Sequence, residues 1–188
     1  MSCAGDSMSL GRFEFLMMNN LFRRWWQKHR EFPLFLRMLR RHGVDLSGAV
    51  IMDAGCGSGY GTKLILEEFK PAGIIAFDLM PEQIRLAKRR GLGVDFRTGD
   101  ATRMEVADAS CDAVFIFGIL HHIPEWRQAL AEAARVLKTG GVLLLEEPHY
   151  RFDWLELEAG IAEAGLAILE RQAWLLGYFR SYLASKKR

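Results

Sequence analysis

The residues with the clearest chemical role lie in one short stretch, 50–61. An apolar run there ends in the acid Asp53 and passes into the loop A-G-C-G-S-G-Y-G. Glycine recurs at every second position of this loop, at Gly55, Gly57 and Gly59. Glycines remove the β-carbons that would hold a ligand away from the backbone, and they tolerate positive φ. Open α/β sheets bind nucleotides at such strand-to-helix loops, so the stretch predicts a nucleotide-sized site.

The glycine spacing narrows the choice of nucleotide. The dinucleotide fingerprint G-x-G-x-x-G needs glycine where this sequence has Tyr60 or Thr62. The P-loop needs Ser or Thr after its lysine, but Leu64 follows Lys63. Nicotinamide oxidoreductases and P-loop enzymes are therefore disfavoured.

Two further acids follow predicted strands. Asp78 ends the apolar run 73–78 and lies nineteen residues after Gly59, close to the separation at which an acid reaches a ribose hydroxyl. The alternative role for Asp78 is a cap on the helix that begins after Pro81. Asp100 follows the strand predicted at 93–97 and could accept a hydrogen bond from an exocyclic amine such as that of adenine.

Two histidines, His121 and His122, follow the strand predicted at 111–117. Imidazole titrates in the range needed for general base catalysis, so either ring is a candidate base. The alternative is that one ring is packed and the other hydrogen-bonds its own loop. Glu146, Glu147 and His149 are weaker candidates after the fifth predicted strand. Cys56 is interpreted as a small loop residue rather than a nucleophile, since no histidine or second cysteine accompanies it.

From residue 48 onward, apolar strand-like runs alternate with helical patterns, which is typical of a parallel α/β sheet. Pro81 and Pro124 mark helix starts. The last two strands are expected to form a hairpin around Leu176 and Gly177. The expected strands are 50–52, 73–78, 93–97, 111–117, 142–147, 166–175 and 178–185, and the expected helices are 62–69, 82–90, 124–137 and 153–165.

Longer strings in residues 48–147 carry a family resemblance. The loop D-A-G-C-G-S-G-Y-G, the later G-D-A-T, the string C-D-A-V-F-I-F-G-I-L-H-H-I-P and the string R-V-L-K-T-G-G-V-L-L-L-E-E-P together resemble class I S-adenosylmethionine-dependent methyltransferases. The resemblance is to the small type 11 group related to ubiquinone and menaquinone biosynthesis enzymes. It implies a Rossmann-like, mostly parallel seven-stranded sheet with helices on both faces and an antiparallel last strand.

The resemblance also implies the cofactor, S-adenosyl-L-methionine, with S-adenosyl-L-homocysteine as the product. By the resemblance, the loop on the sulfonium side of the cofactor maps to Asp53, Ala54, Gly55, Gly57 and Gly59, and the ribose acid maps to Asp78. Leu79 maps to a position against the adenine, and the adenine amine would be accepted by Asp100, with Gly99 and Ala101 beside it. Phe117 and Gly118 map to the wall on the fourth strand.

Composition is that of an ordinary globular chain of 188 residues, long enough for one domain with a single core. The three cysteines form no C-x-x-C pattern, which favours a reducing, cytoplasmic setting, and no metal site is predicted. The longest apolar run, 113–120, is too short to span a membrane. We expect a disordered leader at 1–11, an N-terminal helical cap at 12–44 and the Rossmann-like domain at 45–188.

The segment 12–42 is basic and aromatic, with eight Arg or Lys against two acids and the pair Trp25 and Trp26. Two helices are expected in it, the second opened by Pro33. They could simply pack over the sheet edge, could cover an apolar or acidic substrate, or could contact a membrane surface peripherally. Nucleic-acid binding is disfavoured because the patch is short. As a cap, residues 1–42 should be removable without loss of the fold.

These observations predict methyl transfer to the O, N or C atom of a small-molecule acceptor, with apolar and aromatic molecules among the candidates and His122 or His121 as base. The alternative is a cofactor-binding partner or regulatory protein without its own transfer activity. The sequence indicates neither the acceptor nor the oligomeric state.

Overall fold

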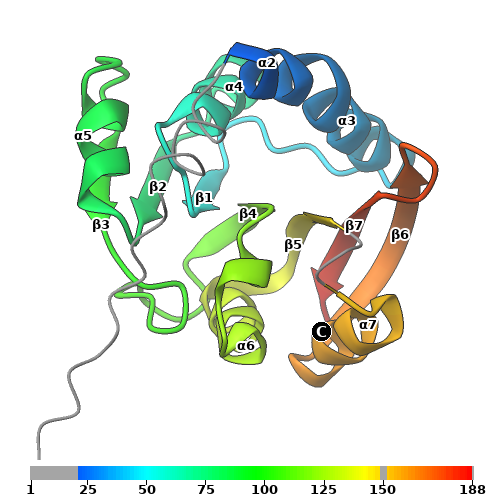
Figure 1. Ribbon diagram of the computed structural model, residues 1–188. Coiled ribbons are helices and arrows are strands. Elements are labelled where there is room, and N and C mark those ends of the chain that lie inside the picture. Colours follow the sequence, from blue (N-terminus) through cyan, green and yellow to red (C-terminus); the bar gives the residue numbers. More distant parts are fainter. Residues whose placement is uncertain (1–20, 149–151, 188) are drawn as a thin grey trace, which may run out of the picture.

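The computed structural model describes residues 21–148 and 152–187, so the predicted leader at 1–11 and part of the predicted cap lie outside the described residues. Seven strands form one sheet in the order β3-β2-β1-β4-β5-β7-β6 (Figure 1). β7 runs antiparallel to both of its neighbours, and the other pairs are parallel. The expected fold class is therefore confirmed. The strands are β1 (Val50–Ala54), β2 (Gly73–Asp78), β3 (Asp95–Thr98), β4 (Cys111–Phe117), β5 (Leu137–Pro148), β6 (Leu166–Trp174) and β7 (Phe179–Lys186).

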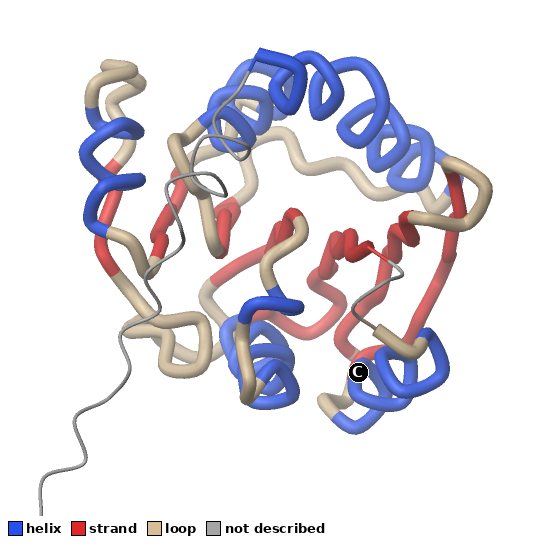
Figure 2. The backbone as a smooth tube through the Cα atoms, in the orientation of Figure 1, coloured by secondary structure: helices blue, strands red, loops and turns tan. Residues whose placement is uncertain are grey.

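Helices cover both faces of the sheet (Figures 1 and 2). α3 and α4 pack on one face, α6 and α7 pack on the other, and α5 packs against β2 and β3. The helical segments are α2 (Leu21–Trp26), the π-helical η1 (Gln27–Glu31), α3 (Phe32–Arg41), α4 (Tyr60–Phe69), α5 (Pro81–Lys88), the 3-10 turn η2 (Leu120–His122), α6 (Trp126–Val136) and α7 (Trp154–Glu163).

The position of β4 in the middle of the sheet explains why its sequence is an unbroken apolar run. Phe115 and Phe117 join the core on the α3 and α4 side, whereas Val114 and Ile116 join the core on the α6 side. Side chains alternate between the faces of a strand, so a strand covered on both faces needs apolar residues at every position. This burial holds the carboxyl end of β4 rigidly beside the glycine loop that follows β1.

The N-terminal helices differ from the expectation that Pro33 opens a second, separate helix. α2, η1 and α3 follow one another without a break, and Pro33 lies in the first turn of α3. At the end of the π turn, the Phe32 N–H donates to the carbonyl of Gln27, five residues earlier. Proline has no N–H to donate to an earlier carbonyl of the helix. The π turn just before it changes which carbonyls accept hydrogen bonds, and the chain stays helical through Pro33.

α3 is part of the core rather than a cap. Phe35 and Met38 are fully buried, and Leu39 is nearly so, against the sheet face that α4 also covers. Deletion of residues 1–42 would expose this cluster, so we now expect that truncation to destabilise the fold rather than to spare it. α2 and η1, which precede α3, are the part of the described segment that reaches the cavity.

β5 begins earlier than expected. Residues 138–141 were predicted to end the preceding helix and turn, but they lie inside β5, where the pairing with β4 shifts register between Cys111 and Ala113. A bulge of this kind absorbs extra residues without ending the strand. The far end of β5 reaches Pro148 and places Glu146 in the cavity wall, while Glu147 lies behind it against His121.

Candidate active site

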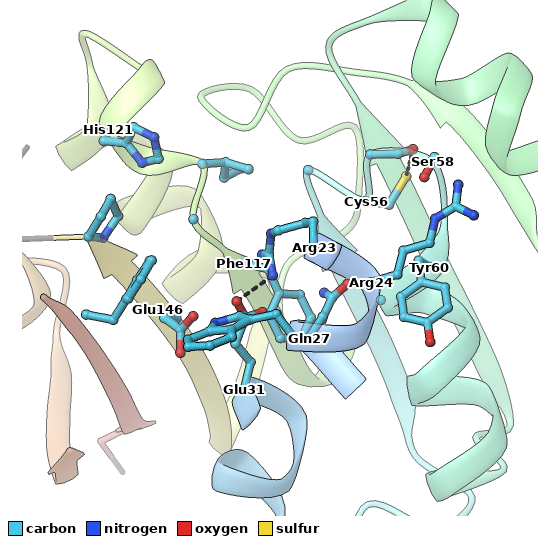
Figure 3. Close-up of a pocket in the computed structure, with 18 of the residues that line it drawn as sticks. Arg23, Arg24, Gln27, Glu31, Cys56, Ser58, Tyr60, Phe117, His121 and Glu146 are labelled. Carbon is cyan, nitrogen blue, oxygen red and sulfur yellow. Dashed lines mark hydrogen bonds and ion pairs between the residues drawn. The ribbon is translucent and has the colours of Figure 1, made fainter. Parts of the chain in front are cut away.

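A cavity of about 660 Å³ opens at the carboxyl ends of β1, β4 and β5 (Figure 3). Its walls are the glycine loop, the start of α4, the end of β4 with η2, the end of β5, one side of α2 and η1, and the hairpin between β6 and β7. Residues from both ends of the chain therefore meet over the loop that the sequence singled out. A pocket at this place is where open α/β sheets bind ligands.

The glycine loop is held in shape by the neighbouring strand. The N–H groups of Gly55 and Cys56 both donate to the carbonyl of Phe77 at 2.9 Å, and that of Gly57 donates to Asp78 Oδ2 at 2.9 Å. A side chain at Gly55 would collide with Ile119, whereas a β-carbon at Gly57 would meet no atom within 4 Å. The loop is thus preformed, with open space beside Gly57 that a ligand can enter.

Asp53 presents a buried acceptor next to this loop. Its side chain is almost completely buried, and Oδ2 accepts a hydrogen bond from the Thr62 hydroxyl at 2.6 Å. Oδ1 has no hydrogen-bond partner among the described residues. Burial, with a smaller contribution from the charge of Asp78, raises the pKa of Asp53 to about 7. An unpartnered carboxylate oxygen at the cavity wall is suited to a cationic group on a ligand.

Arg24 of α2 faces the same cavity and is a residue that sequence reasoning did not single out. Its buried Nε has no hydrogen-bond partner among the described residues, and its guanidinium lies over the Tyr60 ring at 6.0 Å. Asp53 and Arg24 thus offer one acceptor and one donor of opposite charge. The ammonium and carboxylate of an amino acid match that pair, so these residues fit the methionine end of S-adenosylmethionine.

Asp78 and Asp100 lie at the expected strand ends but are occupied by local bonds. Asp78 accepts from the N–H groups of Gly57 and Met80, both at 2.9 Å, and burial raises its pKa. Asp100 Oδ1 accepts from the Thr102 N–H and hydroxyl, both at 2.8 Å. Asp78 therefore supports the glycine loop and the turn before α5 together, and the ribose and adenine contacts stay proposals.

The other expected cofactor residues occupy different surroundings. Leu79 is exposed, Ala101 is buried, and Gly99 donates its N–H to the carbonyl of Asp78 at 3.1 Å. Phe117 and Gly118 do line the cavity, where Gly118 has a φ of 65° and donates its N–H to the Glu146 carbonyl at 2.8 Å. The fourth-strand wall is thus beside the glycine loop, as expected.

His121 is the better positioned of the two histidines. Its Nδ1 lies 2.7 Å from Glu147 Oε2, and Glu147 Oε1 accepts from the Leu120 N–H at 2.8 Å. Glu147 is fully buried, and the ring of His122 lies 3.9 Å from that of His121, centroid to centroid. A carboxylate on Nδ1 keeps the proton there and makes Nε2 the basic nitrogen. His149 lies outside the described residues.

Glu146 points to the opposite side of the strand from Glu147. Its Oε2 accepts from the Ser181 hydroxyl at 2.7 Å and from the Trp174 indole N–H at 3.2 Å. On the same side, Arg23 of α2 donates to Glu31 of η1. Figure 3 shows Glu146, Glu31 and Arg23 gathered at one end of the cavity, with His121 farther away.

Aromatic side chains surround that end of the cavity. The ring of Trp174 stacks on Phe179 at 4.7 Å and lies 5.0 Å from Trp26 of α2. Phe22 and Tyr178 line the cavity while remaining 67% and 44% exposed, so they stand at its mouth. The site can therefore accommodate a largely apolar molecule that enters between α2 and the β6–β7 hairpin.

Cys56 is not suited to nucleophilic chemistry. Burial, together with the nearby carboxylates of Asp53 and Asp78, raises the pKa of its thiol far above the usual range. Its interpretation as a small loop residue agrees with this. Within residues 21–148 and 152–187, no group of three or more His, Cys, Asp or Glu side chains is arranged to hold a metal ion. In the same residues, every helix is too short or too polar to cross a bilayer.

Comparison with known proteins identifies the family. Residues 52–145 match the methyltransferase domain family. The fatty-acid O-methyltransferase of Mycolicibacterium smegmatis is 34% identical over 132 residues, covering 69% of this chain and 48% of that protein. The phthiotriol/phenolphthiotriol dimycocerosates methyltransferase 1 of Mycobacterium ulcerans is 34% identical over 131 residues, with the same two coverages of 69% and 48%. The chain thus spans about half the length of these curated relatives.

A solved structure agrees with the fold. A chain from the complex between the Haloferax volcanii Trm112 methyltransferase activator and a methyltransferase superposes with a TM-score of 0.76 at 19% identity, covering 93% of this chain and 98% of that chain. The narrower resemblance to ubiquinone and menaquinone enzymes stays a prediction. The matched domain, the seven-stranded sheet and the glycine loop together show that the chain belongs to the class I S-adenosylmethionine-dependent methyltransferases.

Proposed function

We propose that this chain transfers a methyl group from S-adenosylmethionine to a small, largely apolar acceptor in the cavity of Figure 3. The observation that carries the proposal is that one cavity joins the glycine loop, the oriented His121 and an aromatic wall. The names of the fatty-acid and phthiotriol methyltransferase relatives support a lipid-like acceptor.

The bound cofactor would supply an electrophilic methyl group on a sulfonium. The chain contributes positioning, which can be worth about 7–11 kcal/mol when the reactants are well aligned. Asp53 and Arg24 hold the charged methionine end, the open space at Gly57 receives it, and Asp78 keeps the loop in place. Phe117 and Gly118, which line the cavity next to this loop, would form one wall of the cofactor site.

His121 takes the proton of an acceptor that carries one. Glu147 fixes the Nδ1–H tautomer and stabilises the imidazolium that forms, which is the role a buried carboxylate plays for a catalytic histidine. His122 lies against the same ring and lines the same cavity, so it is the second candidate.

The test is transfer of a labelled methyl group from S-adenosylmethionine to a lipid and small-molecule extract. A labelled organic-soluble product, absent with Gly57→Val, is expected. Measurable cofactor binding without any labelled product would instead favour the alternative of a cofactor-binding partner protein. Mass spectrometry of a product would identify the acceptor and the methylated atom.

A further inference from the structure

Two carboxyl groups meet at the acceptor end of the cavity, and the reaction described above uses neither. Glu31 of η1 and Glu146 of β5 both line the cavity and are 1% and 3% exposed. Residues this polar are buried only when they are paired. They come from elements 115 residues apart in the chain, and Figure 3 shows their side chains converging.

The closeness of these two groups favours a proton on the pair. Two ionised carboxylates at this place would repel each other, and neither would have a donor to offer the other. Glu31 Oε2 is buried and has no donor among the described residues. Burial, and next the charge of Glu31, raise the pKa of Glu146 well above its usual range. The arrangement therefore favours one proton shared between the two carboxyl groups.

The surroundings of the pair are already charge-balanced. Arg23 faces it from α2 and donates to Glu31, while the Ser181 hydroxyl of β7 and the Trp174 indole of β6 donate to Glu146. With one shared proton, the pair and Arg23 have no net charge. Four carboxyl oxygens nevertheless have more acceptor positions than these three donors and the proton occupy, so the pair can still accept from a ligand.

We propose that Glu31 and Glu146 form the polar subsite of the acceptor pocket and bind an uncharged hydroxyl group, such as that of a phenol or alcohol with an apolar body. The hydroxyl donates to the pair, and the apolar body of the ligand lies against Trp26 and Phe179, behind which Trp174 packs. This subsite selects the acceptor and is independent of which acceptor atom is methylated. The inference rests on the proposed function for naming that ligand as the acceptor.

The charges of the subsite disfavour ligands whose polar group is a carboxylate or an ammonium. A carboxylate would face two carboxyl groups, while the guanidinium of Arg23 is engaged with Glu31. An ammonium would face Arg23 in the same cluster. Burying either charge without a compensating partner is unfavourable, whereas a hydroxyl satisfies an acceptor without adding charge.

The test compares 4-butylphenol with 4-butylbenzoate, which share a body and differ in the polar group. Each is titrated calorimetrically into the 188-residue chain, with S-adenosylhomocysteine present and absent. At pH 7 we expect the phenol to bind at least about tenfold more tightly. The double variant Glu31→Gln/Glu146→Gln should lose that preference, while Glu146→Gln should keep it, because its amide donates to Glu31 as the shared proton does.

The control is Glu67→Gln/Glu163→Gln, which removes the same charge from two exposed glutamates and should keep the preference. Thermal unfolding of every variant shows whether the fold is retained. Equal binding of the two probes by the wild type, tighter benzoate binding, or an unchanged preference in a folded double variant would overturn the subsite.

A pH series tests whether Glu31 and Glu146 recognise the ligand or serve only to stabilise the fold. As pH rises through the raised pKa of Glu146, the shared proton is lost and benzoate binding should weaken further relative to the phenol. Ser181→Ala removes a donor that lowers this pKa, so the change should move to higher pH. A pH profile that Ser181→Ala leaves in place would contradict the proposal. Selective phenol binding without any methyl transfer would contradict the proposed function and leave this subsite intact.

Discussion

The two halves of the cavity are built in different ways. The proposed cofactor half, which is Asp53 with the loop 55–59, comes from one continuous stretch that hydrogen bonds to the adjacent β2 hold in place, and only Arg24 reaches it from elsewhere. The proposed acceptor half, which is the rest of α2 with η1, the end of β5 and the β6–β7 hairpin, gathers segments from both ends of the chain. A local, self-supported half suits a cofactor that many proteins share, and an assembled half can vary with the acceptor.

The halves also differ in how their charges are satisfied. Asp53 and Arg24, which α2 brings to the cofactor half, each leave a buried polar atom of opposite charge type without a partner among the described residues, so this half suits a charged ligand. In the acceptor half, Glu146 has protein donors and Arg23 pairs with Glu31, so only the acceptor oxygen Glu31 Oε2 is left without a partner there among the described residues. Substitutions in one half should therefore alter cofactor affinity, and substitutions in the other should alter acceptor use.

The largest effect is expected at His121. His121→Gln should lower turnover by about 100-fold or more, because a positioned general base contributes about 10²–10⁴-fold. Cofactor affinity measured by calorimetry should stay within about twofold. His122→Ala should cost less turnover, since Glu147 orients the His121 ring. His42→Gln, at the surface beside Glu170, is the control. A loss of cofactor affinity equal to the loss of turnover would make His121 structural.

Gly57→Val should nearly abolish cofactor binding, by about 100-fold or more. The branched side chain enters the open space beside the loop, and φ of 52° prevents it from turning aside without strain. Gly48→Val is matched to it, with a φ of 67° and no atom within 4 Å of the added β-carbon, but it lies outside the cavity. If both variants bound the cofactor equally, the cofactor half would lie elsewhere.

Asp78→Ala should weaken cofactor binding by about tenfold or more, because it removes charge-assisted bonds worth roughly 1.5–3 kcal/mol. Some of that loss would come from releasing the Gly57 N–H rather than from a ribose hydroxyl. Comparing S-adenosylhomocysteine with its 2′,3′-dideoxy analogue separates the two causes. Asp45→Ala, which removes a similar Asp-to-Ser47 turn at the surface, should have no effect. An unchanged affinity at Asp78→Ala would refute both roles.

A separate effect concerns stability and pH. The pKa of Asp53 rises from 3.8 to about 7 on folding, so its contribution is fully present below about pH 4 and is lost as pH rises through 7. Asp53→Asn should therefore leave the cofactor-free protein as stable as the wild type near pH 4 and more stable by about 4 kcal/mol at pH 8, because each pKa unit corresponds to about 1.36 kcal/mol. Urea unfolding at both pH values measures this. A variant less stable at pH 8 would show that Asp53 is not strained.

Local patterns predicted the elements around the glycine loop. The loop after β1, the acids Asp53 and Asp78 at the ends of β1 and β2, and the buried strand β4 all lie where the sequence predicted them. Glu147 and His121 were both named as candidates, but their pairing was not predicted, because 26 residues separate them and only the β4–β5 register brings them together. Arg24 and Glu31 were seen only as members of a basic segment.

Sequence alone determined the sheet, the glycine loop and the family, because each depends on patterns within a few tens of neighbouring residues. Tertiary structure alone decided that α3 belongs to the core, that Arg24 reaches the cofactor half, and that Glu31 meets Glu146. Those outcomes depend on how a continuous helix with a π turn is rotated against a distant strand. A one-dimensional pattern does not encode that rotation, because the same apolar spacing permits several packings.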